Sequence, residues 1–487
     1  MISLSTSRIN DTLSFTETMA ACHVVLLPFM AYGHMIPMAD MAVLFASRGL
    51  QTTIVTTSST AHRLTNSIQK TVNYTHQIAL HIIEFKAGLP PGIDNPDQII
   101  SNEHMYGLLE ALSTLQEPFE QFVEKSQPDC IVVDMFFPWT TETAARFNIP
   151  RIAFNGTGFF PMCVSEAMRL YQPTSSSDSE PFVVPHLPHE IKLTRKQLPQ
   201  FEAEEFKVFL KVLIQAVEAE AKSYGVIFNS FYELEPEYVH HYREVLKRKS
   251  WHIGPVSLCN KSTEDKLERG KKSAIDEHVC LKWLESKPPS SVIYVSFGTI
   301  VKVSISQLYN IAIGLEACNE NFIWVIRNDQ ETFIPEGFEA RMQVKGKGLI
   351  IKGWAPQLLI LEHESVGGFM THCGWNSVLE GVSSGVAMVA WPVMAEQFNN
   401  SKLVTDVLQI GVSIRDVEWS ADSTCEGVKW EAIERAVARV MGAKEGDNMR
   451  MRAQELKNKA NKAVEKGGSS YSDLTTFIEN IKAFKSK

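Results

Sequence analysis

Short apolar runs alternate with longer stretches of helical periodicity along most of this 487-residue chain. The first run, residues 23–29, is typical of a buried strand. In the next stretch the apolar residues share one helical face, and Pro37 and Gly49 are predicted to open and close that helix. The β-branched run at residues 52–57 predicts a second strand. A strand, a helix and a strand in this order predict a parallel βαβ unit.

The same alternation recurs in both halves of the chain. In the first half, further strands are predicted at residues 130–134, 151–154 and 225–230, and residues 251–255 end this half. In the second half, strands are predicted at residues 291–296, 322–326, 348–351, 366–371 and 386–389. Because helical stretches separate these strands, we expect an α/β protein made of two doubly wound halves in tandem.

Shifts in composition divide the chain into five predicted parts. These are a disordered leader (residues 1–20), a first α/β domain (21–255), a linker (256–280), a second α/β domain (281–465) and a C-terminal segment (466–487), with packing of that segment on the first domain as one option. The linker contains a run of mixed charges, residues 262–272, which predicts exposure to solvent. Residues 182–199 hold several prolines and predict an irregular loop.

The charge balance narrows the possible partners. The chain has 47 Lys and Arg against 56 Asp and Glu, a net charge of −9. Proteins that bind nucleic acids normally carry a basic surface, so we expect no nucleic-acid partner. The longest apolar stretch, residues 386–395, is ten residues long. This is about half of a membrane-spanning helix, so we expect no integral membrane association.

The spacing of the cysteines and the composition of the first residues indicate the cellular compartment. The closest two of the eight cysteines, Cys259 and Cys280, are 21 residues apart, which leaves no CxxC redox or metal motif. Scattered free thiols are typical of a reducing cytosol. The first twenty residues lack the basic start and apolar core of a secretory signal. We therefore expect a cytoplasmic protein.

Two polar side chains follow predicted strands of the first half. His34 lies in the loop after the first strand, and Asp134 ends the strand at residues 130–134. Open α/β sheets bind ligands beyond the carboxyl ends of their strands, so the two side chains can converge there. A neutral imidazole can take a proton from a hydroxyl while a carboxylate fixes its tautomer. The alternative is that His34 caps a helix and Asp134 binds backbone N–H groups.

The densest group of polar and aromatic residues lies at 354–397. A predicted strand runs into the sequence HCGWNS at residues 372–377, and a helix follows. A turn of this kind, marked by glycine, leaves free backbone N–H groups at the start of the helix. Phosphate groups commonly bind there. The alternative is a capping box between Ser377 and Glu380, which needs no ligand.

Three further features of the second half suit ligand binding. Trp354 and Gln357 offer an aromatic face and an amide for a planar base, although a single tryptophan is more often part of a core. Glu396 and Gln397 follow another predicted strand and can hydrogen-bond sugar hydroxyls. Thr299 also follows a strand and offers a second approach to phosphate, or belongs to a plain strand-to-helix turn.

Some common nucleotide motifs are absent from the sequence. There is no GxGxxG, no GxxxxGK[ST] and no strict DxD. These absences disfavour a dinucleotide-dependent oxidoreductase, a P-loop nucleotidase and a metal-bridged diphosphate site. We therefore expect neither a resident cofactor nor a metal.

Residues 354–397 are similar along all 44 positions to the signature box of plant UDP-sugar-dependent glycosyltransferases of small molecules, glycosyltransferase family 1. The resemblance extends to His34, Asp134 and residues 228–231 and 294–298. It implies a GT-B fold, in which two Rossmann-like doubly wound domains face each other across a cleft. The donor would then bind to the C-terminal domain and the acceptor to the N-terminal domain.

The resemblance implies a role for each matched residue. The uridine contacts would be Trp354 stacked on uracil, Ala355 and Gln357 at the uracil edge, and Glu380 on the ribose. The diphosphate contacts would be Thr299, His372, Gly374, Asn376 and Ser377. The sugar contacts would be Trp375, Glu396 and Gln397. Further contacts to sugar or acceptor are predicted for Gly33, Phe136, Thr157 and Ala395. Two departures are Thr299, where serine is commoner, and Tyr32, where glutamine often precedes Gly-His.

The resemblance also implies a mechanism. His34 would act as base on an acceptor hydroxyl and Asp134 would orient it, with inversion at the anomeric carbon. Helix N–H groups and His372 would meet the charge on the leaving diphosphate. Gln397 resembles the glucose-preferring form of the box, with UDP-galactose and UDP-glucuronate as alternative donors.

Residues 33–37 and 134–139 resemble the subgroup that glycosylates flavonoids, other phenolics, and triterpenoid or steroid saponin aglycones. Four phenylalanines either line an apolar acceptor pocket or belong to the core, namely Phe136, Phe137, Phe159 and Phe160. We expect a monomer that binds UDP-glucose and a hydroxylated aglycone. The rival hypotheses are a non-catalytic nucleotide-sugar-binding protein and a retaining or phosphorylase-type enzyme of the same fold.

Overall fold

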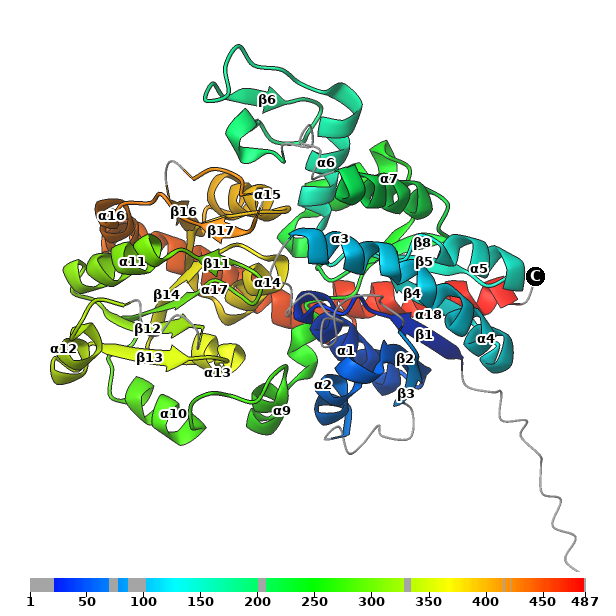
Figure 1. The fold of residues 1–487 in the computed structure, drawn as a ribbon, viewed down its shortest axis with the longest axis horizontal. Helices are drawn as coiled ribbons and strands as arrows, with labels where there is room; N and C mark the ends of the chain where they lie inside the picture. The colour runs from blue at the N-terminus through cyan, green and yellow to red at the C-terminus, as the bar shows by residue number, and fades with distance from the viewer. Residues whose placement is uncertain are drawn as a thin grey trace, which may run out of the picture.

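Two lobes lie side by side in the computed structural model, each built around a parallel β-sheet with helices on both faces (Figure 1). The structure describes residues 22–69, 78–85, 102–199, 207–327, 334–414, 417–420 and 422–485. The predicted leader, residues 1–20, lies outside the described residues.

The first lobe contains a seven-stranded sheet in the order β3-β2-β1-β4-β5-β8-β9, with every neighbouring pair parallel. Its strands are β1 (His23–Leu27), β2 (Gln51–Thr57), β3 (Ile78–Ile83), β4 (Cys130–Asp134), β5 (Arg151–Phe154), β8 (Gly225–Phe228) and β9 (Ser250–His252). Its helices are α1 (Tyr32–Ser47), α2 (Ser58–Gln69), α3 (Asn102–Ala111), α4 (Gln116–Ser126), α5 (Thr140–Phe147), α6 (Phe159–Tyr171), α7 (Lys207–Ala221) and α8 (Pro236–His240).

The second lobe contains a six-stranded parallel sheet in the order β13-β12-β10-β14-β15-β16. Its strands are β10 (Val292–Ser296), β12 (Asn321–Ile326), β13 (Gly348–Lys352), β14 (Val366–Thr371), β15 (Ala387–Ala390) and β16 (Gly411–Ser413), with β11 (Lys302–Val303) and β17 (Thr424–Cys425) paired beside it. Its helices are α9 (Thr263–Glu268), α10 (Glu277–Glu285), α11 (Ile305–Ala317), α12 (Phe338–Val344), α13 (Gln357–Glu362), α14 (Trp375–Ser384), α15 (Gln397–Lys402) and α16 (Trp430–Met441).

The strands are buried on both faces, which explains their continuous apolar sequences. In β1, Val24 packs into the core beside α1, whereas the adjacent Val25 packs into the core beside α3 and α4. In β10, Ile293 and Tyr294 divide in the same way between two further cores. This alternation places helices on both sides of each sheet and confirms the predicted doubly wound α/β class.

Strand order places a crevice in each sheet. Chain order reverses between β1 and β4 in the first sheet and between β10 and β14 in the second. Loops that leave the carboxyl ends of two such strands run to opposite faces, and ligands bind in the gap between them. The residues that follow these four strands are therefore the first place to look for a site.

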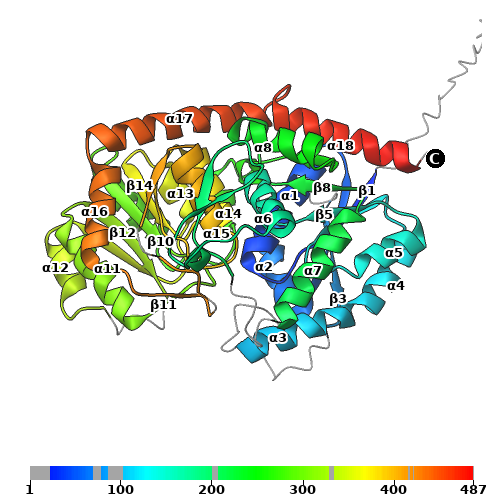
Figure 2. The same cartoon turned by 90° about the horizontal axis from the view of Figure 1, so that it is seen from above.

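Two long helices, α17 (Lys444–Val464) and α18 (Ser469–Lys485), run along one side of the molecule past both sheets (Figure 2). On α18, the buried Phe477 packs against Phe45 of α1 and Trp251 of β9, with ring centroids 5.6 and 5.2 Å away. Asp473 accepts hydrogen bonds from Arg243 and from the backbone of His252. The C-terminal helix is therefore part of the core of the first lobe.

The structure differs from the sequence prediction at Pro37. Helix α1 begins at Tyr32, so Pro37 lies inside the helix rather than at its start. A proline has no N–H for the carbonyl four residues earlier, which here belongs to Gly33. That carbonyl instead accepts a hydrogen bond of 2.6 Å from Nδ2 of Asn376 in the second lobe.

The predicted irregular loop at residues 182–199 contains a short antiparallel hairpin of β6 (Phe182–Val184) and β7 (Ile191–Leu193). The outer residues of each strand are buried and the middle one is exposed. Such an alternation over only three residues is too short to recognise in a sequence.

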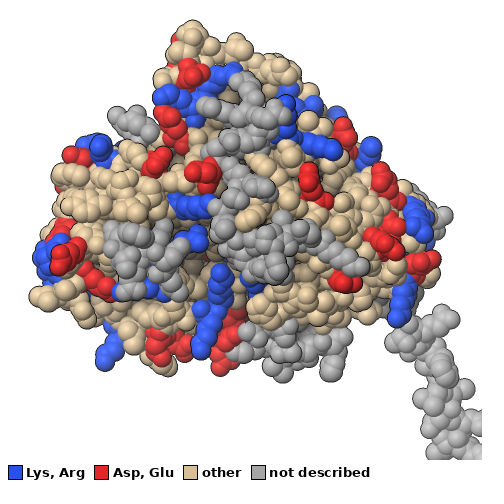
Figure 3. All heavy atoms as spheres, in the orientation of Figure 1, with Lys and Arg blue, Asp and Glu red and all other residues tan. Residues whose placement is uncertain are grey.

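The surface carries charges of both signs. On the face seen in Figure 3, basic and acidic side chains are interspersed. Within the part of the chain that the structure describes, no helix is both long and apolar enough to cross a bilayer.

Candidate active site

His34 and Asp134 meet at the crevice of the first sheet. Nδ1 of His34, in the first turn of α1, lies 2.7 Å from Oδ2 of Asp134 at the end of β4. The other carboxylate oxygen accepts the backbone N–H of Phe136. Because the fully buried carboxylate accepts from Nδ1, the proton resides on Nδ1 and Nε2 is the basic nitrogen. The two residues predicted as base and orienter are therefore in direct contact.

The surroundings of His34 adjust its basicity. The rings of Phe29 and Phe136 each meet the imidazole edge to face, with ring centroids 5.5 and 5.7 Å away. Burial lowers the pKa of His34, but the charges of Asp134 and Glu396 and the hydrogen bond to Asp134 outweigh it, so the pKa lies above its ordinary value. Glu396 is the N-cap of α15 in the second lobe, so a carboxylate of the opposite lobe acts on this imidazole.

The crevice of the second sheet holds His372 between two glycines. A Cβ added at Gly298, after β10, would lie 2.7 Å from Cε1 of His372, and one added at Gly374 would lie 2.5 Å from Nε2. Both positions therefore need glycine. Burial lowers the pKa of His372 to about 4, so the ring is neutral at pH 7. Its buried Nδ1 has no hydrogen-bond partner among the described residues.

Helix α14 starts directly after this turn. Gly374 is its N-cap and Cys373 before it has a φ of +63°, a strained value for a residue with a side chain. Because the helix begins at Trp375, Ser377 lies inside its first turn, and the capping box expected as an alternative is not formed. The N–H groups of the first turn are left available for an anion.

The residues predicted to bind the nucleoside lie together. Nε2 of Gln357, the first residue of α13, donates to Oε2 of Glu380 at 2.6 Å and lies 3.4 Å from Oγ of Ser377. Trp354 is half-buried and its ring lies 5.3 Å from that of Tyr32 in the first lobe. The neighbouring Ala355 is buried. This group offers an aromatic ring, an amide and a carboxylate in one place.

The residues predicted near the sugar occupy two different settings. The indole of Trp375 is buried, packs against Gly158 and donates from Nε1 to the backbone oxygen of Asn229 at 2.7 Å. Trp375 therefore joins the two lobes. Gln397 is also buried, and its side-chain oxygen accepts the backbone N–H groups of Val393 and Met394. Among the described residues nothing accepts from its amide N–H groups, which are left for a ligand.

Four predicted residues border this region. Ala395 has a φ of +50°, which turns the backbone sharply just before Glu396. Glu396 accepts a hydrogen bond from Asn400, and burial raises its pKa. The hydroxyl of Thr157 is buried and has no hydrogen-bond partner among the described residues. Thr299 lies in the turn after β10, next to Gly298 and half-buried.

The four phenylalanines considered for the acceptor pocket differ in their exposure to solvent. Phe137, Phe159 and Phe160 are fully buried in the core. Phe159 stacks on Phe228 with centroids 3.8 Å apart, and Phe160 meets Tyr238 edge to face. Only Phe136 is partly exposed, beside His34. The core interpretation is therefore correct for three of the four.

Sequence reasoning assigned no role to two residues near the site. Glu235 accepts the backbone N–H groups of Phe159 and Phe160 at the start of α6, and burial raises its pKa to about 7. Arg269 belongs to the charged run that predicts exposure to solvent, but its side chain is only 11% exposed between Asp40 and Glu380. The contacts that give both residues these roles join positions that are distant in the chain.

Two doubly wound domains that meet at the carboxyl ends of their strands define the GT-B class of glycosyltransferases. Comparison with known proteins agrees. Residues 23–422 match the family described as UDP-glucoronosyl and UDP-glucosyl transferase. The chain therefore belongs to this family of UDP-glycosyltransferases, as its resemblance to the plant enzymes predicted, and the GT-B fold is confirmed.

Particular relatives cover almost the whole chain. It is 54% identical over 476 residues to scopoletin glucosyltransferase of Nicotiana tabacum, across 96% of this chain and 99% of that one. It is 50% identical over 482 residues to UDP-glucose flavonoid 3-O-glucosyltransferase 7 of Fragaria ananassa, across 96% and 97%. The crystal structure of Glycyrrhiza uralensis UGT73P12 complexed with glycyrrhetinic acid 3-O-monoglucuronide matches with a TM-score of 0.87 and 39% identity, across 96% of each chain.

Proposed function

We propose that this UDP-glycosyltransferase is an inverting, UDP-glucose-dependent O-glucosyltransferase. Its acceptor would be a hydroxyl of a lipophilic plant metabolite, either a flavonoid or other phenolic, or a triterpenoid or steroid saponin aglycone. The observation that carries the proposal is the 2.7 Å contact between His34 and Asp134 on the lobe opposite the start of α14. The glucosyltransferase names of the relatives support glucose as the sugar.

In the proposed reaction, Nε2 of His34 takes the proton of the acceptor hydroxyl. The acceptor oxygen forms a bond to the anomeric carbon as the bond from that carbon to the diphosphate oxygen breaks. Attack from the face opposite UDP inverts the configuration from α to β. Asp134 stabilises the imidazolium that forms. The N–H groups of α14 and the side chain of His372 stabilise the negative charge that develops on the departing diphosphate.

The donor would lie on the second lobe. Trp354, Gln357 and Glu380 supply a ring, an amide and a carboxylate, which match uracil and ribose hydroxyls. His372 between its two glycines has an unpartnered buried nitrogen, which fits a hydrogen-bonding ligand such as diphosphate. Gln397 and Glu396 retain polar atoms for the sugar. The first lobe would then supply the base and the acceptor pocket.

The test is a transfer assay with UDP-glucose, UDP-galactose and UDP-glucuronate against a panel of hydroxylated flavonoids, coumarins and triterpenoids. Mass spectrometry reports a hexose or glucuronate added, and proton NMR reports the anomeric configuration. We expect glucose to be transferred fastest and the product to be a β-glucoside. An α-linked product, a clear preference for another donor, or UDP binding without transfer to any acceptor would contradict the proposal.

A further inference from the structure

A buried ion-pair network connects the linker to both lobes. Nε of Arg269 lies 2.9 Å from Oδ2 of Asp40, and Nη1 lies 2.5 Å from Oε1 of Glu380. The side chains of Arg269, Asp40 and Glu380 are only 11, 6 and 5% exposed. Asp40 belongs to α1, whose first turn carries His34, and Glu380 belongs to α14, whose first turn faces the donor site. One guanidinium therefore joins the two helices that begin at the candidate site.

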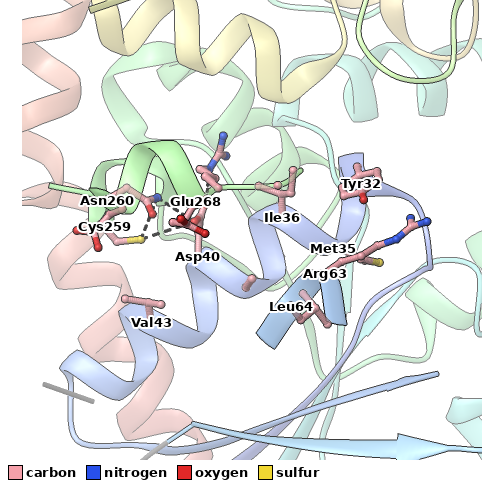
Figure 4. A pocket seen from close by; sticks show the side chains of 14 residues that line it. Tyr32, Met35, Ile36, Asp40, Val43, Arg63, Leu64, Cys259, Asn260 and Glu268 are labelled. Carbon is pink, nitrogen blue, oxygen red and sulfur yellow. Dashed lines mark hydrogen bonds and ion pairs between the residues drawn. The ribbon is translucent and has the colours of Figure 1, made fainter. Parts of the chain in front are cut away.

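The first-lobe end of this network lies in a pocket between α1 and the segment before α9. Asp40 projects from α1 toward this segment, where it accepts a hydrogen bond of 2.9 Å from Nδ2 of Asn260 (Figure 4). Tyr32 and Arg269 line the same pocket. The position of Asp40 is thus fixed from two sides, and Asp40 in turn fixes Arg269.

The positive charge of Arg269 also sets the protonation of the two carboxylates in the network. Burial lowers the pKa of its guanidinium, but Asp40 and Glu380 raise it by more, so it stays protonated. Burial and the charge of Glu380 raise the pKa of Asp40, while Arg269 opposes that rise. Without the guanidinium, two carboxylates would share one buried space, and one of them would gain a proton or move away.

At the second-lobe end, each oxygen of Glu380 has its own donor. Arg269 holds Oε1, and Nε2 of Gln357 holds Oε2 at 2.6 Å. The residue after Arg269, Gly270, has a φ of +97° and lies directly against the six-membered ring of Trp354. The linker therefore contacts two of the residues proposed to bind the nucleoside, the carboxylate of Glu380 and the ring of Trp354.

We propose that Arg269 is a positioning residue for the donor nucleoside, holding the carboxylate of Glu380 in the orientation that accepts hydrogen bonds from the ribose hydroxyls. Asp40 anchors Arg269 to α1, so the same contact ties ribose recognition to the helix that carries His34. This inference rests on the proposed function, because it assumes that Glu380 receives a ribose.

The test compares UDP with 2′,3′-dideoxy-UDP by calorimetry, in the full-length protein and in Arg269→Met. The wild-type protein is expected to prefer UDP by about tenfold or more, since hydrogen bonds to a charged acceptor are lost in the analogue. In Arg269→Met, UDP binding weakens by about tenfold. Binding of the dideoxy analogue changes little, so the preference disappears. A merely structural role would weaken both ligands equally and preserve the preference.

A matched control is Arg248→Met. Arg248 also bridges two carboxylates, those of Glu166 and Glu220, at 2.8 Å each, but contacts none of the donor residues. We expect Arg248→Met to leave the UDP preference unchanged. If Arg269→Met does not fold, Arg269→Lys serves instead. Its single ammonium keeps the positive charge but cannot hydrogen-bond both carboxylates as the planar guanidinium does. The preference for UDP over the dideoxy analogue should then fall by about threefold or more.

The outcomes separate the two proposals. If the wild-type protein fails to bind UDP, the proposed function is wrong. If the wild-type protein binds UDP with a clear ribose preference and both Arg269 variants keep that preference, the proposed function stands and the role of Arg269 is wrong.

Discussion

Asp134 binds one nitrogen of His34 and so decides which nitrogen is basic. The carboxylate is fully buried at the end of β4, and a backbone N–H holds its second oxygen. Such a carboxylate both fixes the tautomer and favours the imidazolium. The pH dependence of transfer should therefore report on this pair.

Asp134→Asn should slow transfer by about 10²-fold or more and move the acidic limb of the pH profile to lower pH. In the proposed mechanism transfer needs neutral His34, so the rate should fall as the pH drops through the pKa of His34, which lies above its ordinary value. Removing the Asp134 charge removes one cause of that raised pKa. The measurement is kcat/KM from pH 5 to 9 for both proteins. An acidic limb that does not move would contradict the pairing.

The sequence identified residues that lie in one continuous motif or directly after a predicted strand, as His34 and Asp134 do. Residues 354–397 form one continuous motif, so most of the proposed donor residues come from a single segment. Arg269 could not be predicted in this way, because its partners Asp40 and Glu380 are 229 and 111 positions away. In sequence it belongs to a charged run, whose usual meaning is exposure.

At the scale of elements, strands were easier to predict than helix starts. Parallel strands buried on both faces have continuous apolar sequences, and the predicted strands begin and end close to observed ones. The edge strands β3 and β16 were not predicted. Helix α1 starts before Pro37 because Asn376 supplies the hydrogen bond that the proline removes. Helix α14 starts at Trp375 with glycine rather than serine as its cap. Both starts contact the opposite lobe, through Asn376 and through Trp375, and local sequence does not record such contacts.

The turn after β10 gives a prediction at this scale. Gly298→Ala places a Cβ 2.7 Å from His372 and keeps a residue with a side chain at a φ of +71°. The backbone strain alone costs about 1–2 kcal/mol. We expect UDP binding to weaken by about tenfold or more as His372 is displaced. Calorimetry measures the affinity, and circular dichroism verifies the fold.

Gly427→Ala is the matched control, since its φ is +82° but nothing lies within 4 Å of the added Cβ. It carries the same kind of backbone strain without a collision at the donor group. Equal UDP affinity in Gly298→Ala and the wild-type protein would show that His372 does not need this turn.

At the scale of the molecule, α17 and α18 connect the lobes along one side (Figure 2). Phe477 of α18 is fully buried between rings of α1 and β9. Phe477→Ala should therefore reduce the free energy of unfolding by about 3–5 kcal/mol. Urea denaturation followed by tryptophan fluorescence measures the change.

The control for Phe477→Ala is Met451→Ala on α17, where the side chain is 57% exposed. This substitution should change the free energy of unfolding by about 0.5 kcal/mol or less. If Phe477→Ala were equally mild, α18 would not be part of the core of the first lobe.

The two lobes bring the separate halves of the site together. Asn376 and Trp375 of the second lobe donate hydrogen bonds to Gly33 and Asn229 of the first. The repeated βαβ pattern predicted two domains, and strand order explains why their crevices contain His34 and His372. The exact meeting of the lobes follows from contacts such as these, which no single segment encodes.

The most direct test of the account is His34→Ala, assayed for glucose transfer and for binding of UDP-glucose. The proposed base lies on the first lobe and the proposed donor residues lie on the second, so the two properties should separate. We predict that transfer falls by at least about 10²-fold while the affinity for UDP-glucose is unchanged. Full turnover by His34→Ala on an alcohol that is not already activated would contradict the account.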